Sequence, residues 1–111
     1  MTDNEIDFGA LDMRVGTVIG AEPFPEARKP AIKLTIDFGP DLGIKHSSAQ
    51  ITMHYSPDQL VGRQVVAAVN LGTRRIAGFV SEVLVLGATP NPGEVILLMP
   101  DRAVPDGARI S

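Results

Sequence analysis

The chain has 111 residues, 44% of them hydrophobic, with a formal net charge of −3 and no cysteine. This length fits one domain with a single core, and the absence of cysteine excludes a disulfide framework and thiolate zinc sites. The net negative charge argues against a general nucleic-acid coat, and because no apolar run approaches the roughly 18 residues of a membrane span, we expect a cytoplasmic protein without membrane insertion.

The first predicted strand follows an acidic stretch, residues 1–11, which we interpret as an N-terminal extension. Residues 13–20 alternate in character and contain two glycines that permit a sharp bend, as a long strand needs if it is to pair on both sides of a barrel. Residues 24–30 predict a loop with two bases near its tip. Apolar side chains at every second position of 32–38 predict a half-buried strand.

The middle of the chain predicts a turn at 39–43 and a third strand at 44–53. A short helix is indicated next, over residues 56–62. It opens with serine at the N-cap, proline at the first helical position and glutamine three residues after the cap, and it closes on glycine. Residues 63–71 are apolar on both faces, which predicts the most buried strand.

An arginine-containing loop is expected at 72–78, followed by a strand at 80–86. Residues 88–111 form a C-terminal extension that contains one further strand, 95–99. The whole chain therefore predicts a single all-β domain, residues 1–111: a five-stranded OB-fold barrel with one short helix between strands 3 and 4 and an extension at each end. Other small β-barrels have a similar pattern.

Six segments, in order along the chain, carry a resemblance to a known family: Asp12–Val18, Pro23–Ala31, Ile32–Leu34, Ser47–Ile51, Leu60–Val65 and Ser81–Gly87. On these the sequence resembles the CsaA proteins, small dimeric relatives of the tRNA-binding domain appended to methionyl-tRNA synthetases. The resemblance implies an OB fold, a homodimer built by the two extensions (1–11 and 88–111), tRNA binding, and a chaperone-like role in protein export. One departure is Asn70–Arg75, where many relatives have aromatic or proline-rich residues.

The candidate RNA site combines outward-facing strand residues with two basic pairs in loops. Strand alternation and the resemblance favour lysine and arginine as phosphate contacts, and small polar groups as donors to phosphate, ribose or base edges. Glu82 would repel phosphate, so we expect it to pair with a nearby arginine. The predicted RNA-binding residues are Arg28, Lys29, Lys33, Lys45, His46, Ser48, Gln50, Arg74, Arg75 and Ser81.

Each of these residues also has an ordinary structural interpretation, as a solvated charge or as a partner of strand-edge backbone. With no tryptophan, one tyrosine and four phenylalanines, of which Phe38 belongs to the expected core, the chain lacks the stacking platforms of a single-strand binder, which favours folded RNA.

The histidines and their neighbouring serine and aspartate match neither a catalytic triad nor metal-ligand spacing, so we expect no enzyme activity, metal or cofactor. The alternative function is a chaperone that binds unfolded export substrates and meets the export machinery. A further alternative is an assembly factor docked on a larger enzyme.

Overall fold

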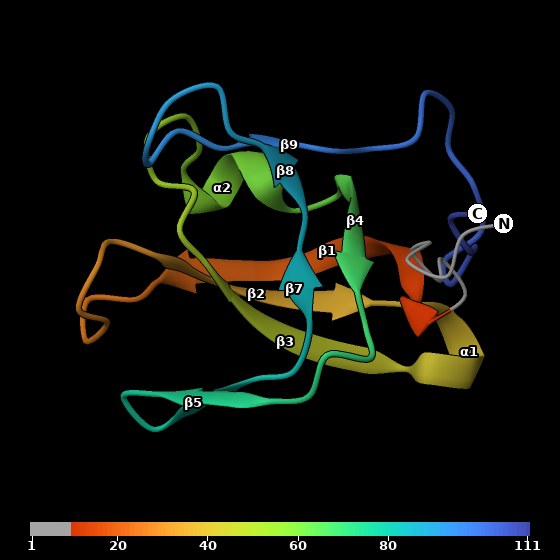
Figure 1. The fold of residues 1–111 in the computed structure, drawn as a ribbon, viewed down its shortest axis with the longest axis horizontal. Helices are drawn as coiled ribbons and strands as arrows, with labels where there is room; N and C mark the ends of the chain where they lie inside the picture. The colour runs from red at the N-terminus through yellow and green to blue at the C-terminus, as the bar shows by residue number, and fades with distance from the viewer. Residues whose placement is uncertain (1–9) are drawn as a thin grey trace, which may run out of the picture.

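The computed structural model describes residues 10–111 and is organised around a five-stranded antiparallel sheet that curls into a nearly closed barrel (Figure 1). The strand order is β3-β2-β1-β4-β7, with β1 at Met13–Pro23, β2 at Ile32–Asp37, β3 at Ile44–Ala49, β4 at Gln64–Ala68 and β7 at Leu84–Val85. The backbone N–H of Glu82 donates to the carbonyl of His46 at 2.8 Å, bringing the chain beside β7 back to the outer strand β3. The predicted all-β barrel is confirmed.

β1 is the long strand that joins the two parts of the barrel sheet, because its first half pairs with β4 and its second half with β2. The register with β2 shifts between Val18 and Gly20, where the strand bends. Gly16 lies on the inner face, where an added Cβ would stand 2.6 Å from Ile36 Cγ2 and 2.8 Å from the Phe38 ring. The first glycine of the predicted bend therefore serves close packing.

Two short helices connect the strands. α2, Pro57–Leu60, lies between β3 and β4 as predicted, and the Gln59 side chain accepts a hydrogen bond from the Ser56 N–H at 3.1 Å. Gly62, at φ +95°, ends this helix in the left-handed conformation. The expected turn at 39–43 is instead a single helical turn, α1, at Gly39–Leu42, because the Gly43 N–H bonds back to the Gly39 carbonyl.

Several predicted boundaries were wrong. The third and fourth strands end early, at Ala49 and Ala68. The segment 80–86 is not one strand, since it is interrupted between β6, Phe79–Ser81, and β7. The predicted loop at 72–78 contains β5, Arg74–Ile76, which pairs with β6 in a hairpin that projects from the barrel (Figure 1). The last predicted strand is reduced to β9, Ile96–Leu97, paired with β8, Gly87–Ala88.

The core lies between the inner faces of β1, β2 and β4 and the helix α2. The alternation predicted for β2 is present, with every second side chain buried and Phe38 fully buried at its end. The most buried large side chains are Phe38, Ile32, Leu34, Ile36, Leu60, Val15, Val18 and Val65. On β4 both faces are buried, as predicted.

The C-terminal segment docks on the barrel along the first residues of β1. Val15 N–H donates to the Ala108 carbonyl and Ile110 N–H to the Met13 carbonyl, both at 2.9 Å, so this segment takes the place beside β1 that β2 leaves free. The predicted N-terminal extension, 1–11, lies outside the described residues except for its last two positions. No helix in the described part of the chain is long and apolar enough to cross a membrane.

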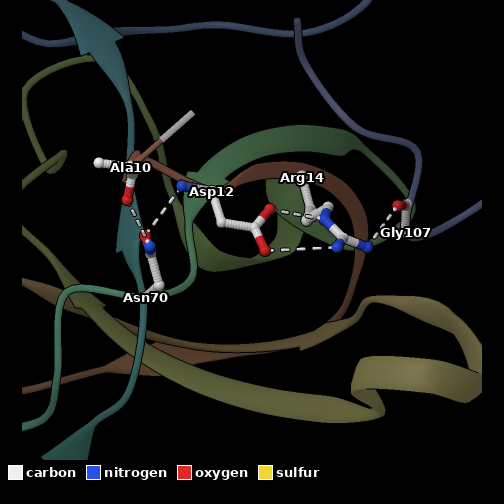
Figure 2. A network of polar contacts seen from close by, with 5 residues as sticks. All are labelled: Ala10, Asp12, Arg14, Asn70 and Gly107. Carbon is white, nitrogen blue, oxygen red and sulfur yellow. Dashed lines mark hydrogen bonds and ion pairs between the residues drawn. The ribbon is translucent and has the colours of Figure 1, made fainter. Parts of the chain in front are cut away.

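Asn70 ties the start of the described chain to the barrel (Figure 2). Its amide donates to the Ala10 carbonyl at 2.8 Å and accepts from the Asp12 N–H at 2.9 Å. The Asp12 carboxylate in turn holds the Arg14 guanidinium at 2.7 Å, and Arg14 donates to the Gly107 carbonyl at 3.2 Å. Asn70 therefore joins a polar network that links both terminal segments to β1.

Candidate nucleic-acid interface

The two basic pairs predicted from sequence lie at one open hollow of about 380 Å³. Arg28 and Lys29 reach it from the loop between β1 and β2, and Arg74 and Arg75 from β5. We call it the basic hollow, and six of the ten predicted site residues line it: Arg28, Lys29, Ser48, Gln50, Arg74 and Arg75. Four cations around two neutral polar side chains make a surface suited to an anionic ligand.

The outward row of β3 forms the floor of the site. Ser47 and Ala49 are buried, so Ser48 faces outward, and buried Ile51 continues the alternation so that Gln50 is exposed. Ser47 Oγ donates to the Val83 carbonyl at 2.9 Å, which makes Ser47 a structural residue. The expectation that Ser48 and Gln50 share a face is met.

Ser81 positions the hairpin that carries the arginines. It is 9% exposed, and its Oγ accepts a hydrogen bond from the Ser48 N–H at 3.0 Å. In the hairpin register Ser81 stands opposite Arg74. The contact therefore ties β6 to β3 and sets the place of Arg74 at the basic hollow, while Ser81 itself is covered by protein.

Lys33 and His46 line a separate hollow of about 300 Å³, the lysine hollow, together with Glu22, Thr35 and Phe79. Lys33 Nζ lies 4.8 Å from the centre of the Phe24 ring and 5.4 Å from that of Phe79, an arrangement that stabilises the cation. It is also 3.7 Å from Glu22 Oε1. The Lys33 charge is thus partly balanced within the protein.

Glu82 pairs with His46 and not, as expected, with an arginine. Its Oε1 accepts the His46 backbone N–H at 2.9 Å and lies 3.1 Å from Nδ1 of the same residue. Partial burial raises the pKa of Glu82, but the two hydrogen bonds from His46 and the charge of Lys45 outweigh burial and hold the pKa below its usual 4.5. Lys45 lies on the opposite face of β3 from His46 and lines none of these hollows.

Sequence reasoning missed the two phenylalanines of this region. Phe24 and Phe79 meet edge to face with ring centres 5.4 Å apart, and Phe79 also meets the His46 ring at 6.2 Å. The signal was present: Ala77-Gly78 separates Ile76 from Phe79, and both turn residues have positive φ, 47° and 83°, as a two-residue hairpin requires. Reading a hairpin there would have placed Phe79 beside β3.

The residues 10–111 contain no group of three histidine, cysteine, aspartate or glutamate side chains placed to hold a metal ion. The two histidines lie apart, since His46 pairs with Glu82 and His54 Nε2 lies 2.7 Å from Glu94 Oε2. The side chains that line the basic hollow offer positive charge and hydrogen-bonding groups.

Comparison with known proteins gives the family. The family model described as "Putative tRNA binding domain" matches residues 13–109. The crystal structure of chaperone CsaA from Bacillus anthracis strain Ames has 56% sequence identity and a TM-score of 0.92, with all of both chains covered. CsaA from Picrophilus torridus has 46% identity and a TM-score of 0.87, covering all of this chain and 99% of the other.

A methionine–tRNA ligase from Bacteroides fragilis is 39% identical over 104 residues. The match covers 94% of this chain but 15% of the ligase, so the chain spans only a small part of the curated relatives it matches. The fold and family expected from the six sequence segments are confirmed. This chain belongs to the tRNA-binding domain family and, within it, to the CsaA proteins.

Proposed function

We propose that this protein is a non-catalytic, cytoplasmic binder of tRNA or tRNA-like folded RNA, and that the basic hollow is its RNA contact surface. The observation that carries the proposal is the meeting of Arg28 and Lys29 with Arg74 and Arg75 around one hollow, in a chain whose net charge is −3. Concentrating cations on one face of an acidic protein directs an anionic ligand to that face.

The mode of binding follows from the residue types. Arginine and lysine neutralise phosphates, while the Ser48 hydroxyl and the Gln50 amide suit ribose hydroxyls and base edges. Phe24 is buried, and the Phe79 ring packs on Phe24 and His46, which leaves little open aromatic surface for stacking successive bases. Recognition of a folded RNA by backbone and shape fits this surface.

The protein acts, in this proposal, as a homodimer. Leu84, Ile96 and Leu98 are each between 40% and 52% exposed, and the Leu98 N–H donates to the carbonyl of Leu86, two residues after Leu84, at 3.2 Å. Exposed apolar side chains at this edge of the sheet suit a symmetric interface. Two basic hollows on one dimer would raise avidity for an RNA that spans both. A Leu84→Glu variant is expected to sediment as a monomer.

Titration of the purified protein with bulk tRNA, followed by fluorescence anisotropy at about 50 mM and about 200 mM salt, tests the proposal, because phosphate binding weakens steeply over this range. We expect affinity at the lower salt in the micromolar range or tighter and a large loss at the higher. Absence of saturable tRNA binding at both salt concentrations would contradict it.

The second candidate is a chaperone that binds unfolded polypeptides for export. It is favoured by the 56% identity to a protein described as chaperone CsaA and by a hollow with largely apolar walls formed by Pro30, Met53 and Val95. An unfolded peptide run in parallel separates the two functions, since apolar peptide binding holds or strengthens as salt rises. Salt-resistant peptide binding without a tRNA signal would favour the chaperone.

A further inference from the structure

A third hollow of about 560 Å³ opens beside the basic hollow, and we call it the apolar hollow. The two share Lys29 and Gln50, so they form one continuous surface. The apolar hollow is bounded by three separate segments, which contribute Lys29 and Pro30, then Gln50, Thr52 and Met53, and finally Val95. Its volume is that of a small-molecule site.

The chain that leaves the end of β3 runs from one hollow into the other. Ser48 lines the basic hollow, Gln50 lines both, and Thr52, in the turn that follows buried Ile51, lines only the apolar hollow. Within the described part of the chain, the amide of Gln50 is engaged in no side-chain hydrogen bond, and both Gln50 and Thr52 are exposed. Their donors and acceptors therefore border an otherwise apolar space.

The far wall of the apolar hollow is fixed in place. His54, next to Met53, lies 2.7 Å from the carboxylate of Glu94, which adjoins Val95. The Asn91 amide donates to the other oxygen of that carboxylate at 2.8 Å. One further tie joins the same two segments, because the Leu97 N–H donates to the Tyr55 hydroxyl at 3.1 Å. A binding space whose walls are held before the ligand arrives loses less conformational entropy on binding.

We propose that the apolar hollow takes a single unpaired nucleobase of the bound RNA while the basic hollow holds the adjoining phosphates. A nucleotide carries a flat, largely apolar ring with polar edges directly beside an anionic group. This is the combination the two hollows offer, with Met53 and Val95 as walls, Gln50 and Thr52 at the edge, and Lys29 at the junction. The inference rests on the proposed function and names a subsite within it.

The test uses two RNA duplexes of equal length and nearly equal charge, one fully paired and one with a single bulged 2-aminopurine, whose fluorescence reports its stacking. We expect the wild-type protein to bind the bulged duplex about five- to tenfold more tightly, a modest gain because the base is buried against aliphatic and not aromatic side chains. The 2-aminopurine emission should change on binding. Equal affinity for both duplexes overturns the subsite but leaves the proposed function intact, whereas no binding of either duplex or of tRNA overturns both.

A matched pair of variants tests whether the apolar hollow is the site that binds the unpaired base. Met53 is 59% exposed and lines the apolar hollow, while Met99 is 58% exposed and lies elsewhere, beside Arg63 and Pro100. Met53→Ala is expected to remove most of the preference for the bulged duplex without weakening the paired one, and Met99→Ala to leave both unchanged. If Met53→Ala instead abolishes unfolded-peptide binding and keeps the bulge preference, the hollow belongs to a polypeptide ligand and the inference is wrong.

Discussion

The hydroxyl of Thr17 donates a hydrogen bond of 2.6 Å to the carboxylate of Asp106, joining β1 to a segment 89 residues further along the chain. The Gln64 amide donates to the same oxygen at 3.3 Å and exchanges two further hydrogen bonds with the backbone of Val104. The C-terminal segment is therefore part of each barrel's own structure, as well as a candidate for the interface between two copies.

Asp106→Ala should lower the free energy of unfolding by about 1–3 kcal/mol, since it leaves the partly buried Thr17 hydroxyl and one Gln64 donor without this acceptor. Urea unfolding at one fixed protein concentration measures the effect, because assembly would otherwise contribute. Asp101→Ala is the control, since that side chain is 99% exposed. Equal effects of the two variants would mean that the side-chain contacts of Asp106 add nothing to stability.

Gly16→Ala should destabilise the barrel by about 1–3 kcal/mol through overpacking. Its new Cβ would stand 2.6 Å from Ile36 Cγ2 and 2.8 Å from the Phe38 ring, and both side chains are fully buried and have little room to move. In Gly20→Ala, in the same strand, the added Cβ would meet only Thr35, at 3.5 Å, so the loss of unfolding free energy should be far smaller. If thermal or urea unfolding gives the two variants nearly the same free energy of unfolding, that result contradicts this packing argument.

Sequence patterns predicted those parts of the fold that local physics decides. Alternation over 32–38 found β2, and Ser56, Pro57 and Gly62 marked α2, because burial on one face and capping are local properties. The residues at which the strands end could not be predicted in this way. The segment 80–86 is apolar at five of its seven positions, yet Val83 turns into the core and Glu82 bonds back to β3, so only the tertiary partner decides where the strand breaks.

The candidate site also has features that the sequence predicted and features that it did not. Alternation is enough to turn Ser48 and Gln50 outward, and the barrel order is enough to bring the two basic pairs to one end. The partners of Lys33 and Glu82 were not predicted, because Phe79 and Glu82 come beside β3 only through the β5–β6 hairpin, whose turn at Ala77 and Gly78 was interpreted as part of a loop. The role of Asn70 likewise required knowing that residues 10–12 run beside it.

Arg74→Ala and Arg75→Ala should each weaken tRNA binding and reduce the slope of log affinity against log salt by about 1, as expected when one phosphate contact is lost. Arg102→Ala is the matched control, because Arg102 is 92% exposed on the C-terminal segment, which lies on the far side of the barrel from the β5 hairpin (Figure 1). If Arg102→Ala reduces the salt slope by the same amount, the RNA phosphates do not bind preferentially at the basic hollow.

Glu22→Gln should strengthen tRNA binding by a few-fold. The Glu22 carboxylate lies 3.7 Å from Lys33 Nζ and competes with phosphate for that cation, while the Phe24 and Phe79 rings would still hold the lysine in place. Filter binding of tRNA at low salt measures the gain. Glu26→Gln, in the loop that follows β1, controls for the change in net charge. An equal gain in both variants would assign the effect to overall charge and not to Lys33.

His46→Ala should raise the pKa of Glu82 towards 4.5, measured by NMR titration of its side-chain carboxyl carbon. Burial favours the neutral acid, and the His46 ring is one of the hydrogen-bond partners that outweigh it in the wild type. Because the folded pKa is the lower one, Glu82 contributes stability above pH 4.5 that is lost as the pH falls through the folded value. His54→Ala, whose partner is Glu94, should leave Glu82 unchanged. If the pKa of Glu82 is unchanged in His46→Ala, the pairing of Glu82 with the His46 ring is refuted.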